Sequence, residues 1–223
     1  MNFDYLSRSD ALLLDKFLKQ FSVFIGIIST IFWLIIVPLD MYFKNISSNH
    51  KFKIFYGYFL ISPMIIISAA IFMEQRWALF WLFVFIWIAD IGAYFFGKLF
   101  GKTKLVETIS PGKTVEGALG GLFTNLLLVS FFIFWTLYQG MVIGIYYDAE
   151  IYVPYLILAF IAVIAITAIS VFGDIYESFL KRQAGVKDSG KLIPGHGGLL
   201  DRLDGFCPTI PLCFMMAIAL NSF

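Results

Sequence analysis

The sequence predicts an all-α integral membrane protein, a polytopic helical bundle of about six transmembrane helices with a charged loop on the cytoplasmic side. Of the 223 residues, 60% are hydrophobic and only 14% are charged, a balance that is not typical of soluble domains. The hydrophobic residues also gather into runs close to the ~20 residues that a helix needs to cross a bilayer. Because a bilayer offers no partner for backbone polar groups, such runs are expected to be helical.

Six runs meet or approach this length and set the order of the elements. They are residues 21–43, 54–73, 77–97, 117–138, 151–173 and 206–223. The last run is short and the first carries Asp40 near its end, so these two have the least sharply defined bounds. Residues 1–20 hold too many charges to cross a bilayer, and they predict a partly amphipathic segment at the membrane interface.

The basic residues divide unevenly between the loops. If the six spans alternate in direction, segments 44–53, 98–116 and 174–205 share one side and hold twelve Lys and Arg, against four on the other side. The positive-inside rule then places these three segments in the cytoplasm and both termini outside.

The third, fourth and fifth spans carry polar groups on that same side. Asp90 lies in the inner part of the third span, where a carboxylate is costly and indicates function; the alternative is a polar group that reaches the cytoplasmic surface. Pro111 and Thr114 can start a helix at the fourth span, with free N–H groups and Lys113 available to a phosphate. The alternative there is a simple capped helix start.

Asp174 follows a 23-residue apolar run at the end of the fifth span. If the helix continues beyond it, Asp174, Glu177 and Lys181 share one face, and Ser178 and Arg182 lie on the adjoining stripe. The alternative is a helix end at the membrane interface with a solvated charged face.

Much of the charge lies in one segment, Ser178 to Asp204, which holds five Lys or Arg and three Asp in 27 residues. Asp201 and Asp204 are three residues apart, so their carboxylates would be neighbours on a helix. Two carboxylates that close repel unless a cation lies between them. Oxygen ligands of this kind suit Mg²⁺ that is shared with substrate phosphates.

Groups suited to an anion surround these carboxylates. Arg202 lies off their face, and the glycines around His196 give a backbone that can turn its N–H groups toward phosphate oxygens. His196 can donate to a phosphate or shuttle a proton, and a direct catalytic role is the less favoured of the two. Together, the carboxylates, cations and glycine-rich turn are suited to phosphoryl or nucleotidyl transfer, which depends mainly on positioning and charge stabilisation.

These residues resemble the signature of the phosphatidate cytidylyltransferases, the CDP-diacylglycerol synthases. The matching positions are Ser178, Lys181-Arg182, Lys187-Asp188, Gly190, Pro194, His196-Gly197-Gly198 and Asp201-Arg202-x-Asp204. Two upstream segments agree, namely Ala89-Asp90 with Ala93-Tyr94 and Gly97-Lys98, and Ser110-Pro111-x-Lys113-Thr114 with Glu116-Gly117. The resemblance runs from about Trp87 to the C-terminus, and residues 1–86 match only in being hydrophobic. Ile91 departs from the pattern, since a Ser or Thr commonly follows the aspartate.

The resemblance implies transfer of a cytidylyl group from CTP to phosphatidic acid, giving CDP-diacylglycerol and pyrophosphate for phospholipid biosynthesis. It implies Mg²⁺ as cofactor, with a second, monovalent cation as an option. Residues 1–86 would be an anchoring part with an interfacial segment and two spans, and residues 87–223 the catalytic region. The expected setting is the inner membrane of a bacterium, with the catalytic loop facing the cytoplasm. Membrane lipid is an expected partner and nucleic acid is not; the oligomeric state stays open, a homodimer included.

The resemblance also implies roles for individual residues. The metal ligands would be Asp174 and Asp201, supported by Asp204, and the catalytic set would add Lys187 and Asp188. The substrates would be bound by Asp90, Lys113, Ser178, Lys181, Arg182, Lys191, His196, Gly197, Gly198 and Arg202. No general base is required, because a phosphate monoester is already ionised near pH 7.

Two alternatives remain. One is a CTP-dependent transferase for another membrane lipid phosphate, or a lipid kinase with a related bundle, which only substrate assays would separate. The other is a transporter or channel with Asp90 and Asp174 on an ion path. It is less favoured, because transporters usually show paired broken helices in two halves, whereas here the charge gathers in one loop.

A cysteine introduced into the loop at 139–150 tests the topology. The six-span arrangement places this loop outside the cell, so an impermeant thiol reagent added to intact cells should label it. Labelling only after permeabilisation would contradict the arrangement.

Overall fold

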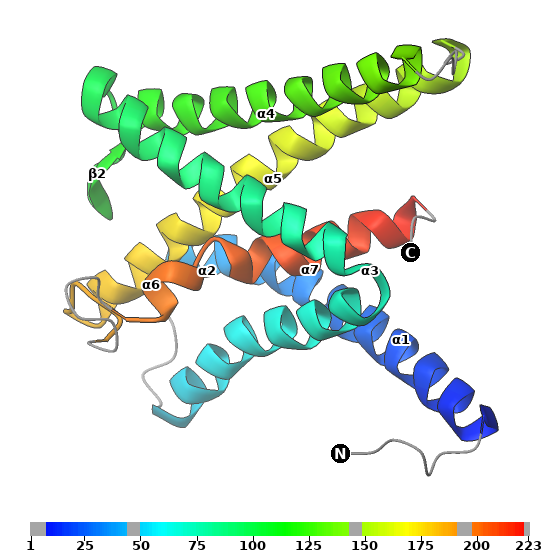
Figure 1. The fold of residues 1–223 in the computed structure, drawn as a ribbon. Coiled ribbons are helices and arrows are strands. Elements are labelled where there is room, and N and C mark those ends of the chain that lie inside the picture. The colour runs from blue at the N-terminus through cyan, green and yellow to red at the C-terminus, as the bar shows by residue number, and fades with distance from the viewer. Residues whose placement is uncertain (1–7, 44–49, 143–148, 191–197, 221–223) are drawn as a thin grey trace. The chain divides into compact units, whose positions relative to one another are not determined.

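A computed structural model describes residues 8–43, 50–142, 149–190 and 198–220 of the chain (Figure 1). Its elements are α1 (Arg8–Ile31), η1 (Phe32–Ile36), α2 (Val37–Phe43), α3 (His50–Phe100), β1 (Lys104–Val106), β2 (Ser110–Thr114), α4 (Val115–Val142), α5 (Ala149–Gln183), α6 (Leu200–Leu203) and α7 (Phe206–Ala219). Apart from one short hairpin with its connections and the segments between α5 and α7, most of the described residues are helical. The predicted all-α fold class is confirmed.

Within the described residues, five helical segments are long and apolar enough to cross a membrane. They are Lys16–Phe43, Tyr56–Phe100, Val115–Val142, Tyr152–Gln183 and Leu200–Ala219. The protein is therefore a multi-pass membrane protein. The charged residues 8–20, expected to form a separate interfacial segment, are helical and continuous with the first of these segments.

The predicted spans 54–73 and 77–97 lie in one helix, α3. Its backbone leaves the helical conformation at Gln75, with φ −141° and ψ 63°, in the gap between the two predicted spans. The segment Tyr56–Phe100 has 45 residues, which corresponds to ~68 Å of helix at 1.5 Å per residue. That is about twice the ~30 Å of a hydrocarbon core, so the segment is long enough for two crossings.

The chain forms two compact units. The first comprises residues 1–80 and 207–223, and the second comprises residues 81–206. In the first unit, Phe32 packs against Tyr56 and Phe59 with ring centroids 5.0 Å apart in both pairs. Lys19 forms an ion pair of 3.0 Å with Glu74.

In the second unit, α3 and α4 cross at small residues. A Cβ atom on Gly121 would lie 2.6 Å from the carbonyl oxygen of Ala89, and one on Gly117 would lie 2.8 Å from that of Ala93. Glycine is therefore required for the two backbones to approach this closely. The crossing brings the Asp90 turn of α3 beside the first turns of α4.

Helices α4 and α5 run side by side in the same unit (Figure 1). The Asn125 side chain is fully buried and donates a hydrogen bond of 2.9 Å to Thr167 Oγ1. A polar bond between buried faces fixes the register of two otherwise apolar helices.

Strand β2 ends where α4 begins. It pairs antiparallel with β1, so that Lys104 faces Thr114, and Thr114 Oγ1 accepts a hydrogen bond of 3.1 Å from the Gly117 N–H. Thr114 thus caps α4, as one of the sequence alternatives expected. The expectation of a helix that starts at Pro111 is wrong, because Pro111 lies in the strand.

Helix α5 (Ala149–Gln183) continues beyond its apolar run. Asp174, Glu177 and Lys181 therefore lie on one helical face, as the sequence analysis expected for a continuing helix. It ends in a glycine-based C-cap, with Gly185 at φ +69°. The Gly185 N–H donates to the Arg182 carbonyl and the Val186 N–H to the Lys181 carbonyl. This is the Schellman pattern, and it places the helix end firmly at Gln183.

Replacement of Gly121 by alanine tests the α3–α4 crossing. The added methyl group has no room against the Ala89 carbonyl, so we expect the free energy of unfolding to fall by about 1–3 kcal/mol. Gly57→Ala is the matched control, because a Cβ there meets nothing within 4 Å and alanine is the better helix former. Denaturation in detergent, followed by tryptophan fluorescence, measures both. Equal loss in the two variants would contradict the crossing.

Candidate functional site

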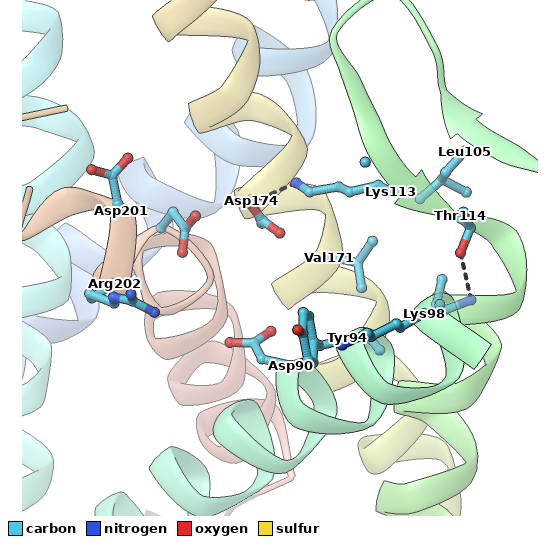
Figure 2. A pocket seen from close by; sticks show the side chains of 16 residues that line it. Asp90, Tyr94, Lys98, Leu105, Lys113, Thr114, Val171, Asp174, Asp201 and Arg202 are labelled. Atoms are coloured by element: carbon cyan, nitrogen blue, oxygen red, sulfur yellow. Dashed lines mark hydrogen bonds and ion pairs between the residues drawn. The ribbon is translucent and has the colours of Figure 1, made fainter. Parts of the chain in front are cut away.

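A cavity of about 440 Å³ lies in the second unit, among the end of α3, the hairpin, the start of α4, α5 and the α6 segment (Figure 2). Its wall includes small and apolar residues such as Ala93, Gly97 and Val171. Its charged lining residues are Asp90, Lys98, Lys113, Asp174, Asp201, Arg202 and Asp204. Six of these seven were predicted as site residues from the sequence; Lys98 was not.

Asp174 and Asp204 form the acidic centre of the cavity. Their carboxyl groups lie within hydrogen-bond reach of each other, and Asp204 Oδ1 also accepts a hydrogen bond of 2.8 Å from the Gly205 N–H. Lys113 Nζ lies 2.6 Å from Asp174 Oδ1, as the dashed line in Figure 2 marks. One lysine offsets only one of the two negative charges, so the pair remains suited to a further cation.

Asp90 and Arg202 lie near this centre. Asp90 is close enough to interact electrostatically with Asp174, Lys113 and Arg202. Lys98, one turn beyond Tyr94 on α3, holds its ammonium group 5.8 Å from the centre of the Tyr94 ring. Within the part of the chain that the structure describes, neither Arg202 nor Lys98 forms an ion pair. Both are therefore available to an anion in the cavity.

Asp201 lines the cavity, but its carboxylate is occupied by hydrogen bonds. Oδ1 accepts from Lys181 Nζ at 2.7 Å. Oδ2 accepts from the Ser189 N–H at 3.0 Å, the Ser189 hydroxyl at 2.8 Å and the Gly198 N–H at 2.7 Å. Figure 2 shows this carboxylate turned away from the side chains of Asp90 and Arg202.

Of the other predicted site residues, those that the structure describes are absent from the cavity lining. Lys181 forms ion pairs with both Glu177 and Asp201. Arg182 Nε donates a hydrogen bond of 3.1 Å to the Ile109 carbonyl, which connects α5 to the hairpin. Ser178 is buried in α5. Lys187 and Asp188 are exposed, and Gly198 is buried. Lys191, His196 and Gly197 lie outside the described residues.

Sequence reasoning gave no role to Glu116, although this residue positions the hairpin. Its carboxylate accepts hydrogen bonds of 3.1 Å from the N–H groups of Lys102 and Thr103. The residues just before β1 are thereby held against the first turn of α4. Glu116 belongs to the matching segment Ser110–Gly117 described in the sequence analysis. Its place in that segment, two residues after Thr114, could have indicated a structural role.

The acidic residues fit a metal ion only in part. Among the described residues, no group of three or more His, Cys, Asp or Glu side chains is gathered closely enough to hold one. The Asp174–Asp204 pair nevertheless suits Mg²⁺, which usually binds through one or two carboxylates and completes its shell with waters and substrate phosphates. The donor set therefore fits an ion shared with a phosphate ligand.

Known proteins share these features of sequence. Residues 10–220 match the model of the cytidylyltransferase family, a match that takes in most of residues 1–86 as well. The phosphatidate cytidylyltransferase of Haemophilus influenzae is 47% identical over 133 residues, or 60% of this chain and 43% of that protein. Its counterpart in Staphylococcus saprophyticus is 43% identical over 136 residues, or 61% of this chain and 47% of that protein. The chain spans about half the length of the curated relatives it matches.

Glu116→Ala tests how the hairpin is held. Without the carboxylate, the amides of Lys102 and Thr103 lose their acceptor, and we expect their hydrogen exchange to accelerate by about tenfold or more. Glu107→Ala is the control, because Glu107 is exposed on the same hairpin. Exchange measured by mass spectrometry on peptides covering residues 102–104 separates the two variants, and equal acceleration in both would contradict the assignment.

Proposed function

The chain belongs to the cytidylyltransferase family, and we propose that it transfers the cytidylyl group of CTP to phosphatidic acid, giving CDP-diacylglycerol and pyrophosphate. The relatives named above carry the name of this activity. The observation that supports it most in the structure is the acidic pair Asp174–Asp204, set in one cavity with Lys113, Arg202 and Lys98. Acidic groups for a cation beside basic groups for phosphates are what such a transfer needs.

The transfer can take place in one displacement, without a nucleophile supplied by the protein. An oxygen of the lipid phosphate attacks the α-phosphorus of CTP, and the new P–O bond joins the lipid phosphate to the cytidylyl group. The bond from the α-phosphorus to the oxygen that bridges to the β-phosphorus breaks, and pyrophosphate leaves with that electron pair. No residue has to remove a proton, because the lipid phosphate is already ionised near pH 7.

Asp174 and Asp204 are the residues that would hold Mg²⁺, and the ion when bound would neutralise charge on the triphosphate. Lys113 orients the Asp174 carboxylate through their ion pair. The Lys113 side chain also lines the cavity, so its positive charge would favour the binding of phosphate groups there. Arg202 and Lys98 supply the remaining cationic groups for the two phosphate-bearing substrates.

The cavity also offers a route for the lipid substrate. Tyr94 lines the cavity and is largely exposed, and Ile91 and Phe95 beside it on α3 are exposed apolar side chains. In a membrane, such side chains face lipid. The head group of phosphatidic acid would lie in the cavity while its acyl chains remain along α3.

The inner membrane of a bacterium is the setting that we propose, with the cavity toward the cytoplasm. The twelve basic residues of the segments 44–53, 98–116 and 174–205 support this orientation. CTP is a cytoplasmic nucleotide, so the same orientation gives the cavity access to it.

Pyrophosphate release from the purified chain tests the function. With CTP, phosphatidic acid and Mg²⁺, we expect release that stops in EDTA and falls by about 100-fold or more in Asp204→Asn, because the acidic pair is then broken. The assay repeated with dCTP, with ATP and with other lipid phosphates distinguishes a cytidylyltransferase from a lipid kinase.

The control is Glu107→Gln, which neutralises an exposed carboxylate on the hairpin and should leave the rate unchanged. Full activity in EDTA would remove the metal from the proposal. Transfer from ATP in preference to CTP would replace the proposed reaction altogether.

A further inference from the structure

The chain returns on itself on either side of residues 191–197. Gly198 lies against Ser189 and Gly190, so closely that a Cβ atom on Gly198 would be 2.6 Å from the Gly190 amide nitrogen. Only glycine fits at such a distance from a backbone atom. Residues 189–190 on one side of this segment and Gly198 on the other therefore lie close together. We call this close approach the neck.

Asp201 joins the two sides of the neck. Its Oδ2 accepts a hydrogen bond from Ser189 on one side and from Gly198 on the other. The Ser189 hydroxyl in turn accepts a hydrogen bond of 3.2 Å from the Asp201 N–H. Ser189 is thus bonded to both the side chain and the backbone of Asp201.

The same carboxylate is fastened to α5 by two charged residues. Lys181 Nζ lies 2.7 Å from Asp201 Oδ1 and 2.5 Å from Glu177 Oε2. The exposed fraction of the side chain is only 5% for Glu177, 19% for Lys181 and 13% for Asp201. Charges that are so little hydrated are stable only when paired, so the bridging position of Lys181 is strongly specified.

Helix α6 has four residues, Leu200–Leu203, and forms the first turn of the helical segment Leu200–Ala219. Because the ends of helices fray, this turn gains from contacts with its side chains. Asp201, Arg202 and Asp204 all line the cavity, but only the Asp201 carboxylate makes the contacts just described. The contacts of Asp201 therefore fix the direction in which Arg202 and Asp204 point.

We propose that Glu177, Lys181, Ser189, Gly198 and Asp201 form a clasp, and that Asp201 and Glu177 are positioning residues which set Arg202 and Asp204 in the cavity. Asp201 then acts through its neighbours, in contrast to the metal-binding role implied by the sequence resemblance. The clasp itself stands on geometry, and only its effect on turnover rests on the proposed function.

Limited proteolysis tests the clasp without any substrate. Lys187 is exposed beside the neck, and cleavage there by trypsin requires the surrounding backbone to open. For Asp201→Asn and Lys181→Met, we expect cleavage after Lys187 to accelerate by about tenfold or more, in proportion to the open population. Ser189→Ala, which removes one side-chain bond, should give a smaller acceleration. Asp204→Asn is the matched control and should cleave at the wild-type rate.

Magnesium dependence separates positioning from metal binding. In pyrophosphate release, Asp201→Asn should lower kcat while the Mg²⁺ concentration for half-maximal rate stays that of the wild type, whereas Asp204→Asn should raise that concentration. Glu177→Gln, which keeps shape and removes only the charge, should show the Asp201→Asn pattern in milder form. It keeps the proposal testable if Asp201→Asn does not elute as a folded protein.

The outcomes are distinct. A raised Mg²⁺ requirement in Asp201→Asn overturns the positioning role, and unchanged cleavage in both Asp201→Asn and Lys181→Met overturns the clasp. If the wild-type chain releases no pyrophosphate, the proposed function fails, and the cleavage rates still decide whether the clasp exists.

Discussion

The charged continuation of α5 beyond its apolar run is the feature on which the rest of the site depends. Three of its side chains contact two neighbouring elements. Asp174 pairs with Lys113 on β2, Arg182 donates to the Ile109 carbonyl in the turn of the same hairpin, and Lys181 pairs with Asp201 on α6. The hairpin is too short to be stable alone, and α6 is the end turn of the helical segment Leu200–Ala219. They are ordered because α5 is a long helix that presents these charges at helical spacing.

Packing and electrostatics cooperate in forming the cavity. The glycines of α4 let α3 approach until their backbones touch at Ala89 and Ala93, next to Asp90. The carboxylates of Asp174 and Asp204 then lie close together. Lys113 on β2 forms an ion pair with Asp174 on α5. The wall of this site also carries Arg202 and Lys98, so groups suited to a cation and groups suited to an anion lie in one cavity.

Much of this could be predicted from the sequence, and the failures have physical reasons. The apolar runs located the spans, and the spacing of Asp174 and Lys181 placed them on one helical face. The sequence could not show that Asp201 is saturated by hydrogen bonds, because three of its donors come from Ser189 and Gly198, and two of those are backbone N–H groups. Nor could it show the strand at Pro111, since the turn that pairs β2 with β1 carries no strong sequence signal. Lys98 was missed because a basic residue at a span end usually indicates topology alone.

The proposed function depends on a divalent ion that Asp174 and Asp204 would hold together with the nucleotide. Binding of Mn²⁺ to the purified chain, followed by electron paramagnetic resonance with and without CTP, tests it most directly. We predict saturable Mn²⁺ binding that CTP strengthens, and loss of that strengthening in both Asp174→Asn and Asp204→Asn. Mn²⁺ binding that CTP does not affect, or that persists unchanged in both variants, would contradict the account.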